Sequence, residues 1–168
     1  PAELPKLEAL LAHWPAHLPC AVEVRHPVFF HKGEEEKAFN QLLITYGANR
    51  VMLDVRPVFS TPANGHAGLA HAQQEKPKVP LHVLSTAELP IIRFIGHIDK
   101  TINTRYFAPW IECLKLWISQ GKTPFLFVHT ADNRESPEMA RHLYHTLQQH
   151  IALPELDPFA DEKQSQLF

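Results

Sequence analysis

Two short segments of the sequence place ionisable side chains inside stretches that otherwise look like buried β-strands. The segment AVEVRHPVFF sets Glu23, Arg25 and His26 close to valines, and VMLDVRP repeats the pattern with Asp54 and Arg56. An isolated charge is costly to bury, so such groups must be paired with one another or with a ligand. The carboxylates could act as general bases, and the guanidinium groups could bind an anion.

Two further segments carry similar side chains at the ends of apolar runs. IIRFIGHID and FVHTADN contribute the remaining candidates, which are Arg93, Gly96, His97, His129, Asp132 and Asn133. Carboxylates and histidines whose surroundings separate their pKa values are suited to proton transfer. The predicted catalytic groups are therefore Glu23, Asp54, His97 and His129. The predicted substrate-binding groups are Arg25, His26, Arg56, Arg93, Gly96, Asp132 and Asn133.

Anion binding is one chemistry that this set predicts. Arg25, Arg56 and Arg93 each offer a forked donor that matches a phosphate or a carboxylate. They outnumber the carboxylates of Glu23 and Asp54, which leaves one positive charge in excess. The glycine of the GHID segment would let a backbone approach the ligand closely. The alternative is that the arginines only neutralise the two carboxylates and that the set has no chemistry.

The sequence patterns that would indicate other chemistries are weaker. Glu23, Asp54, His97 and His129 could together hold a divalent metal, as in a metal-dependent hydrolase or nuclease. No tight ligand spacing such as HExxH supports that alternative, and neighbouring arginines repel a cation. No GxSxG motif indicates a nucleophilic serine. The cofactor, if there is one, is left undetermined by these patterns.

The elements that must position these residues alternate between strand and helix. Helical periodicity predicts helices over 3–14, 33–47, 108–121 and 136–151, and apolar runs predict strands over 20–25, 50–55, 91–95 and 124–129. A long connection over 56–90 interrupts the pattern and includes a short predicted helix near 67–74. Strands that alternate with helices indicate an α/β fold with a parallel sheet.

Alternation of side chains along each strand gives one uniformly apolar face and one face with ionisable groups. The apolar faces suit an outer layer of helices, and the ionisable groups suit the interior and the carboxyl-end rim of a TIM-like barrel. A doubly wound sheet would need two apolar faces. A complete barrel takes roughly 250 residues, so we expect these 168 residues to form about half of one.

Composition excludes several classes of protein. The net charge of −2 gives no basic excess for nucleic acid, and no apolar run reaches the roughly 20 residues that cross a membrane. No signal peptide is visible, so we expect a cytoplasmic protein. Cys20 and Cys113 have no CxxC spacing and are expected to be reduced. Because the chain starts at Pro1, we expect its natural N-terminus to lie further upstream.

Five segments in order carry a family resemblance: AVEVRHPVFF, VMLDVRP, KPKVP, IIRFIGHID and FVHTADN. Together they resemble the YecE-like family, also called the domain of unknown function 72. The resemblance extends from Leu18 to the C-terminus and implies a TIM-barrel-like fold. It also implies that the chain is the C-terminal half of one such domain, with the domain over 1–153 and a tail over 154–168. The family implies no established reaction.

The tail suggests a different class of function. Its last residues, QSQLF, are similar to the short peptide by which bacterial DNA-repair proteins dock on the sliding clamp. Gln164, Leu167 and Phe168 would make that contact, although Ser165 stands where leucine is usual. A disordered tail, or one that packs on its own domain, is the alternative.

The sequence thus predicts an enzyme that binds a small anion, such as a phosphorylated substrate, at the barrel rim. Glu23 or Asp54 would act as base and His97 or His129 as acid. The alternative is a non-catalytic binding or adaptor protein, linked to DNA repair through its tail. Four strands alone would leave two sheet edges and an unfilled inner face, so we also expect the isolated chain to self-associate.

Overall fold

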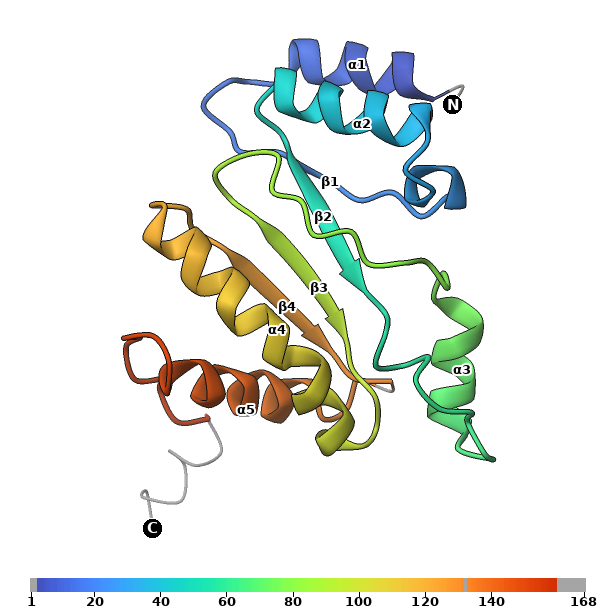
Figure 1. The fold of residues 1–168 in the computed structure, drawn as a ribbon, viewed down its shortest axis with the longest axis vertical. Coiled ribbons are helices and arrows are strands. Elements are labelled where there is room, and N and C mark those ends of the chain that lie inside the picture. The colour runs from blue at the N-terminus through green and yellow to red at the C-terminus, as the bar shows by residue number, and fades with distance from the viewer. Residues whose placement is uncertain (1–2, 132, 160–168) are drawn as a thin grey trace.

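The computed structural model describes residues 3–131 and 133–159. The helices are α1 Leu4–His13, the 3₁₀ helix η1 Pro27–Phe30, α2 Glu34–Thr45, α3 Ala67–Glu75, α4 Lys100–Ser119 and α5 Ser136–Gln148. The strands are β1 Ala21–Val22, β2 Asn49–Asp54, β3 Ile91–Ile95 and β4 Phe125–His129. Strands and helices alternate along the chain (Figure 1), which confirms the predicted α/β class.

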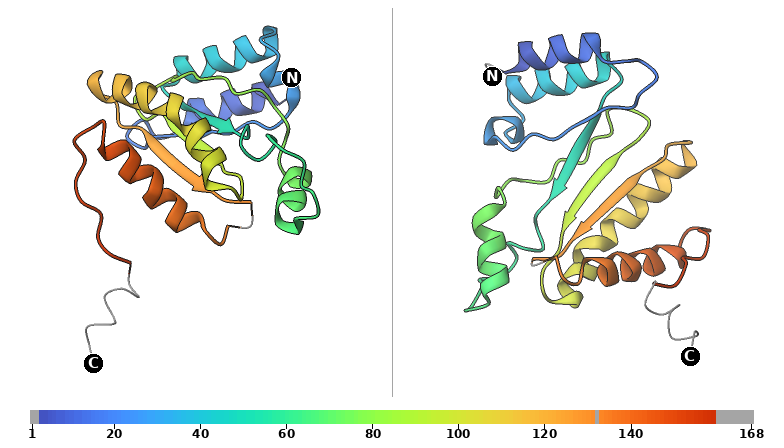
Figure 2. Two further views of the ribbon diagram at one scale, coloured as in Figure 1. Left: turned by 60° about the horizontal axis from the view of Figure 1, so that its bottom comes forward. Right: turned by 180° about the vertical axis from the view of Figure 1, so that it is seen from behind.

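The four strands form one parallel sheet in the order β1-β2-β3-β4. α4 and α5 cover one face of the β3–β4 half, and α1 and α2 lie together at the β1 end (Figures 1 and 2). The right-hand view of Figure 2, from behind the molecule, shows the opposite face of the β3–β4 half, which we call the open face. This consecutive parallel order is compatible with part of a TIM-like barrel.

Two predicted boundaries were wrong. The first strand pairs only over Ala21–Val22, because the chain turns into the 3₁₀ helix that begins at Pro27. The helix predicted from 108 begins at Lys100, where the side chain of Asp99 accepts a hydrogen bond from the Thr101 amide at 2.8 Å. Pro109 lies inside this helix.

A glycine with positive φ follows two of the helices. Gly47 has a φ of 63° and follows α2, and Gly121 has a φ of 80° and follows α4. Both positions need the left-handed backbone that glycine adopts without strain. The hydroxyl of Ser136, the first residue of α5, accepts a hydrogen bond from the Thr130 amide at 2.9 Å. That bond ties the start of α5 to the end of β4.

Buried apolar side chains form two core clusters. One joins α1, η1, α2 and α3 to Leu53 and Ile95 of the sheet. The other packs α4 and α5 against Ile92 and Phe94 of β3, with partly buried Leu126 and Val128 of β4 at its margin. In place of a helix between α3 and β3, residues 76–90 run in an extended path across the sheet (Figure 1).

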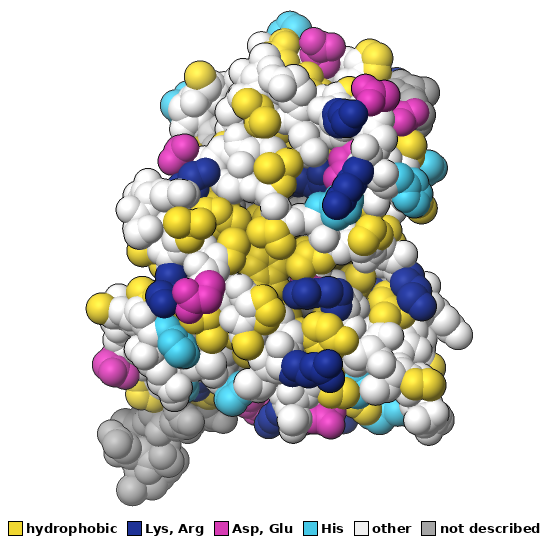
Figure 3. All heavy atoms as spheres, viewed as in Figure 1, with side chains coloured by type: hydrophobic (Ala, Val, Ile, Leu, Met, Phe, Trp, Pro, Cys, Tyr) yellow, Lys and Arg dark blue, Asp and Glu magenta, His cyan; other side chains and the backbone are white. Residues whose placement is uncertain are grey.

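The open face is less well covered near β4. Phe125 and Phe127 point to this face, and Phe127 keeps 51% of its surface exposed. On the opposite side of the molecule, Figure 3 shows hydrophobic side chains near the centre and charges of both signs dispersed around them. Self-association through the open face stays a prediction.

Candidate functional site

The open face carries a charged cluster centred on Glu23. Its carboxylate accepts a hydrogen bond from Arg25 Nε at 2.9 Å through Oε1, and Oε2 accepts one from Arg93 Nη1. Arg93 reaches it from β3 across the intervening strand β2. The Glu23 and Arg93 side chains are 19% and 21% exposed, whereas the Arg25 side chain is 60% exposed. Glu23 and Arg93 are therefore partly shielded from water, and Arg25 remains accessible to a ligand.

His129 extends the cluster along β4. Arg93 pairs with Phe127 in the ladder, and His129 is two residues further along β4, on the same face. Arg93 Nη2 lies 3.5 Å from His129 Nε2. Burial, followed by the charge of Arg93, lowers the pKa of His129, and a hydrogen bond with the Asn133 side chain only partly opposes this. The imidazole is therefore neutral at neutral pH. We call Glu23, Arg25, Arg93, His129 and Asn133 the Glu23 cluster.

The charges of the Glu23 cluster do not cancel. Burial is the largest influence on Glu23 and opposes its ionisation, but the hydrogen bonds and charges of Arg93 and Arg25 outweigh it and lower its pKa. One carboxylate thus faces two guanidinium groups, while His129 is neutral. The cluster has a net charge of about +1, as two always-protonated arginines against one ionised carboxylate require.

Asp54 lies on the opposite face, which corrects the predicted face for β2. In the ladder Asp54 pairs with Phe94, so its side chain points toward α4, whereas Leu53 pairs with Arg93 on the open face. The fully buried Asp54 carboxylate accepts a hydrogen bond from Trp110 Nε1 of α4 at 2.8 Å. Alternation correctly separated the two faces of β2 but could not say which one turns toward the helices.

Arg56 forms an ion pair with the Asp54 carboxylate. Its Nε and Nη2 donate to the two Asp54 oxygens at 2.8 and 2.7 Å, and its backbone amide donates to one of them at 3.1 Å. Its guanidinium also lies over the Tyr106 ring, 5.5 Å from the ring centre. With the Trp110 bond, Asp54 accepts four hydrogen bonds. Asp54 and Arg56 therefore form a saturated pair that is separate from the Glu23 cluster.

His97 lies just beyond the end of β3, and its side chain hydrogen-bonds to Thr61 and Asp99 rather than to the Glu23 cluster. Its Nδ1 accepts from the Asp99 amide at 3.0 Å, so the proton is on Nε2, which donates to Thr61 Oγ1 at 2.9 Å. The Asn103 side chain bonds to both backbone groups of His97 at 2.7 Å. Burial lowers the pKa of His97. These bonds join the loop after β2 to the start of α4.

The remaining predicted residues have local roles in the structure. A Cβ at Gly96 would come within 3.0 Å of Asn103 Oδ1 and 3.2 Å of the His129 carbonyl oxygen, so the glycine permits close packing between β3, β4 and α4. The exposed His26 caps η1 by accepting from the Val28 amide at 3.3 Å. Asp132 lies outside the described residues, as do the tail residues Gln164, Leu167 and Phe168.

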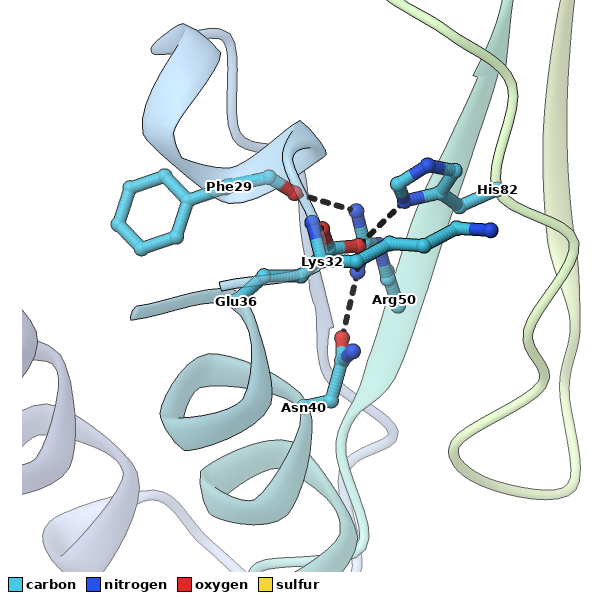
Figure 4. A network of polar contacts seen from close by, with 6 residues as sticks. All are labelled: Phe29, Lys32, Glu36, Asn40, Arg50 and His82. Atoms are coloured by element: carbon cyan, nitrogen blue, oxygen red, sulfur yellow. Dashed lines mark hydrogen bonds and ion pairs between the residues drawn. The ribbon is translucent and has the colours of Figure 1, made fainter. Parts of the chain in front are cut away.

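Sequence reasoning missed a second charged cluster, drawn in Figure 4. Arg50 Nη1 of β2 donates to Glu36 Oε1 at 2.9 Å and to Asn40 Oδ1 at 2.6 Å, and Nη2 donates to the Phe29 carbonyl oxygen at 3.0 Å. His82, from the extended segment, bonds to the same Glu36 oxygen. We call Glu36, Asn40, Arg50 and His82 the Arg50 cluster.

The Arg50 cluster is more deeply buried than the Glu23 cluster. The Arg50 side chain is only 1% exposed, and its guanidinium lies 5.5 Å from the ring centres of both Phe30 and Phe39. Its signal in the sequence was a charged residue at the start of an apolar strand. Glu36 lies in the acidic first turn of α2, where the helix dipole alone favours a carboxylate, so the sequence gives no sign of its buried partner.

Comparison with known proteins decides the family. A model described as protein of unknown function DUF72 matches residues 1–164. The chain belongs to this family. It is 44% identical over 169 aligned residues to UPF0759 protein YecE of Escherichia coli strain K12, and equally to that of strain O157:H7. These matches cover the whole chain but 61% of each relative, so the chain spans about three fifths of their length. No solved structure matches.

The DUF72 assignment confirms the resemblance carried by the five sequence segments. For this DUF72 chain, no group of three or more His, Cys, Asp or Glu side chains within 3–131 and 133–159 is arranged to hold a metal ion. The set predicted for a metal is divided, because Asp54 and Glu23 face opposite sides of the sheet. Within the same described ranges, no helix is both long and apolar enough to cross a membrane.

Proposed function

We propose that this DUF72 chain binds a small anion, a phosphate or carboxylate group, at the Glu23 cluster. We propose also that the longer protein uses this site for acid–base chemistry with His129. The observation that carries the proposal is the uncancelled charge, since Arg25 and Arg93 share the single carboxylate of Glu23. In a TIM-like barrel the open face would be the interior, where ligands bind near the carboxyl ends of the strands.

The two arginines suit complementary tasks in binding. Arg93 is held between Glu23 and His129, so its guanidinium is oriented before a ligand arrives. Arg25 is largely exposed and can turn from Glu23 toward an anion. A forked guanidinium bonds to both oxygens of a phosphate or carboxylate and thereby fixes its orientation. The ligand anion would then supply the negative charge that the cluster lacks.

The proton chemistry follows from the state of His129. Its Nε2 faces the Arg93 guanidinium, which can only donate, so Nε2 is unprotonated and can accept a proton. Glu23 is a poor base because two arginines stabilise its ionised form. Of the four predicted acid–base groups, His129 is therefore the one that we propose as base. A bound anion would raise its pKa and prepare it to return the proton as an acid.

Thermal unfolding in the presence of inorganic phosphate tests the binding step. A ligand that binds only the folded chain raises the unfolding midpoint with concentration. We expect that rise in the wild type and its loss in Arg93→Gln and Arg25→Gln. The matched control is Arg105→Gln, at an exposed arginine on α4. Equal phosphate stabilisation in all four proteins would contradict the proposal.

A further inference from the structure

A largely apolar cavity of about 660 Å³ lies between α4, α5 and the helix-covered face of β4. The two helices diverge toward their C-terminal ends (Figure 1). The cavity is on the face of β4 opposite His129 and is therefore separate from the Glu23 cluster. Its main walls are Leu114 and Ile118 of α4, Leu126 and Val128 of β4, and Leu143 and Leu147 of α5.

Residues 153–159 form a strap along the outer side of the cavity, which Leu153, Leu156 and Phe159 help to line. Three side chains from α5 hold the strap backbone. Tyr144 Oη and Gln148 Nε2 donate to the Pro154 carbonyl oxygen at 2.8 and 2.9 Å, and Arg141 Nη2 donates to the Asp157 carbonyl oxygen at 2.6 Å. The strap is thus attached by side chains of one helix, and its apolar residues form the outer wall.

Arg141 gives the cavity a polar end. Its guanidinium stacks on the Phe159 ring at 4.0 Å, and its Nε is buried with no hydrogen-bond partner among residues 3–131 and 133–159. A buried donor without an acceptor is unfavourable, and a carboxylate is the acceptor that would satisfy it best. Among the described lining residues the other cation is Lys122, whose amine donates to Ser85 Oγ at 2.9 Å, and none is acidic.

We propose that this cavity binds a small amphipathic carboxylate such as a medium-chain fatty acid. The apolar chain lies among the leucines of α4 and α5, and the carboxylate accepts from Arg141 Nε. Two features support that class over a neutral apolar ligand: the unsatisfied Arg141 donor and the absence of acidic side chains from the described lining. The volume is within the range of roughly 300 to 1,000 Å³ that is usual for small-molecule sites.

Calorimetric titration of the chain with decanoate and decanol tests this assignment, because the two probes share a chain and differ in charge. We expect saturable binding of both, with decanoate tighter by about tenfold or more, the usual effect of a charge-assisted bond in a shielded site. In Arg141→Gln, decanoate should fall to the affinity of decanol, and decanol should bind as before. A merely structural role for Arg141 would weaken both probes together.

Two further variants separate charge from shape. Tyr144→Phe removes one strap bond and keeps Arg141, so the preference for decanoate should persist. Ala140→Phe should fill the cavity and abolish binding of both probes, with circular dichroism to verify folding. Equal affinity of wild type for both probes, no binding of either, or an unchanged preference in Arg141→Gln would overturn the proposal. In Arg93→Gln the preference for decanoate over decanol, and its loss when Arg141→Gln is added, should persist, which distinguishes this site from the anion site on the open face.

Discussion

The Arg50 cluster and the Glu23 cluster are built from the same four kinds of side chain, which are glutamate, arginine, histidine and asparagine. In the first, Glu36 accepts from Arg50, His82 and the Lys32 amide, and the ion pair of Glu36 and Arg50 is buried, with aromatic rings next to the guanidinium. In the second, Glu23 lies between two arginines on a partly exposed face. Their difference is in burial and in charge balance rather than in composition.

That difference distinguishes a cluster that stabilises the fold from one that can bind a ligand. Arg50 has acceptors from a carboxylate, an amide and a backbone carbonyl, so a ligand would have to displace bonds that are already good. The cluster joins η1, α2, β2 and the extended segment, and we interpret it as a structural centre (Figure 4). Arg25 is exposed and shares the Glu23 carboxylate with Arg93, so the Glu23 cluster can take an anion without losing a buried bond.

The largest expected effect is therefore on stability, at the Arg50 cluster. Arg50→Met should reduce the free energy of unfolding by about 3–5 kcal/mol, because it leaves the buried Glu36 carboxylate without its guanidinium partner. Arg93→Met, which removes the corresponding residue of the more exposed cluster, should cost about 1–2 kcal/mol. Urea unfolding of both variants measures the two values. Equal losses would mean that the Glu23 cluster is also a structural centre.

A second substitution tests whether Asp54 lies on the helix-covered face, as the structure places it. Asp54→Asn should reduce the free energy of unfolding by about 2 kcal/mol, because Arg56 loses its ion pair and Trp110 loses a charged acceptor. It should leave phosphate stabilisation unchanged, since Asp54 faces α4. Asp99→Asn is the matched control, because asparagine caps a helix about as well as aspartate. If Asp54→Asn changes phosphate stabilisation, the separation of the two faces is wrong.

Acid should weaken the fold in two stages. The pKa values of His97 and His129 are lowered from 6.5 in the folded chain, so the unfolded chain binds more protons as the pH falls below 6.5, and stability declines. The pKa values of Glu23 and Glu36 are lowered from 4.5, because hydrogen bonds from their partners outweigh the opposing effect of burial. Their contribution is present above 4.5 and is lost as the pH falls through the folded-state values.

Urea unfolding between pH 7 and 5 measures the first stage. The double variant His97→Gln and His129→Gln should flatten the decline over that range, and His150→Gln, at an exposed position, serves as the control. A slope that is the same in the double variant as in the wild type would show that other groups cause the decline. The second stage should persist in the double variant, because it depends on the two glutamates.

The smallest expected effect is on the affinity for phosphate. Glu23→Gln removes the carboxylate that competes with the anion for Arg25 and Arg93, so phosphate should bind a few-fold more tightly. Glu36→Gln, the corresponding change in the Arg50 cluster, should give no such gain. The dependence of the unfolding midpoint on phosphate concentration measures both. Weaker binding in Glu23→Gln would indicate that Glu23 contacts the ligand directly.

Particular residues show what the sequence could predict. Alternation along the strands correctly put Glu23, Arg93 and His129 on one face, because side chains alternate strictly in a strand. The same rule failed for Asp54, since an acidic residue can turn toward the helices when an indole and a guanidinium meet it there. Which face is inward depends on partners that alternation does not describe.

The Arg50 cluster could not be predicted from the sequence for a different reason. Its bond between Glu36 and His82 joins residues 46 positions apart, and its bond between Arg50 and the Phe29 carbonyl spans 21 positions. Neither contact has a local sequence signal. The α/β class, by contrast, follows from helices and strands that each span a few turns or a single apolar run, and these were read from periodicity.

The central claim is that the Glu23 cluster accepts an anion and the Arg50 cluster does not. Phosphate titration of the chain with ¹⁵N-labelled histidine, followed by NMR, tests it with an internal control. His129 is 3.5 Å from Arg93 in one cluster, and His82 bonds to Glu36 in the other. We predict that the ring signals of His129 shift with phosphate until saturation and that those of His82 do not move. A stationary His129, or equal shifts of both histidines, would contradict the account.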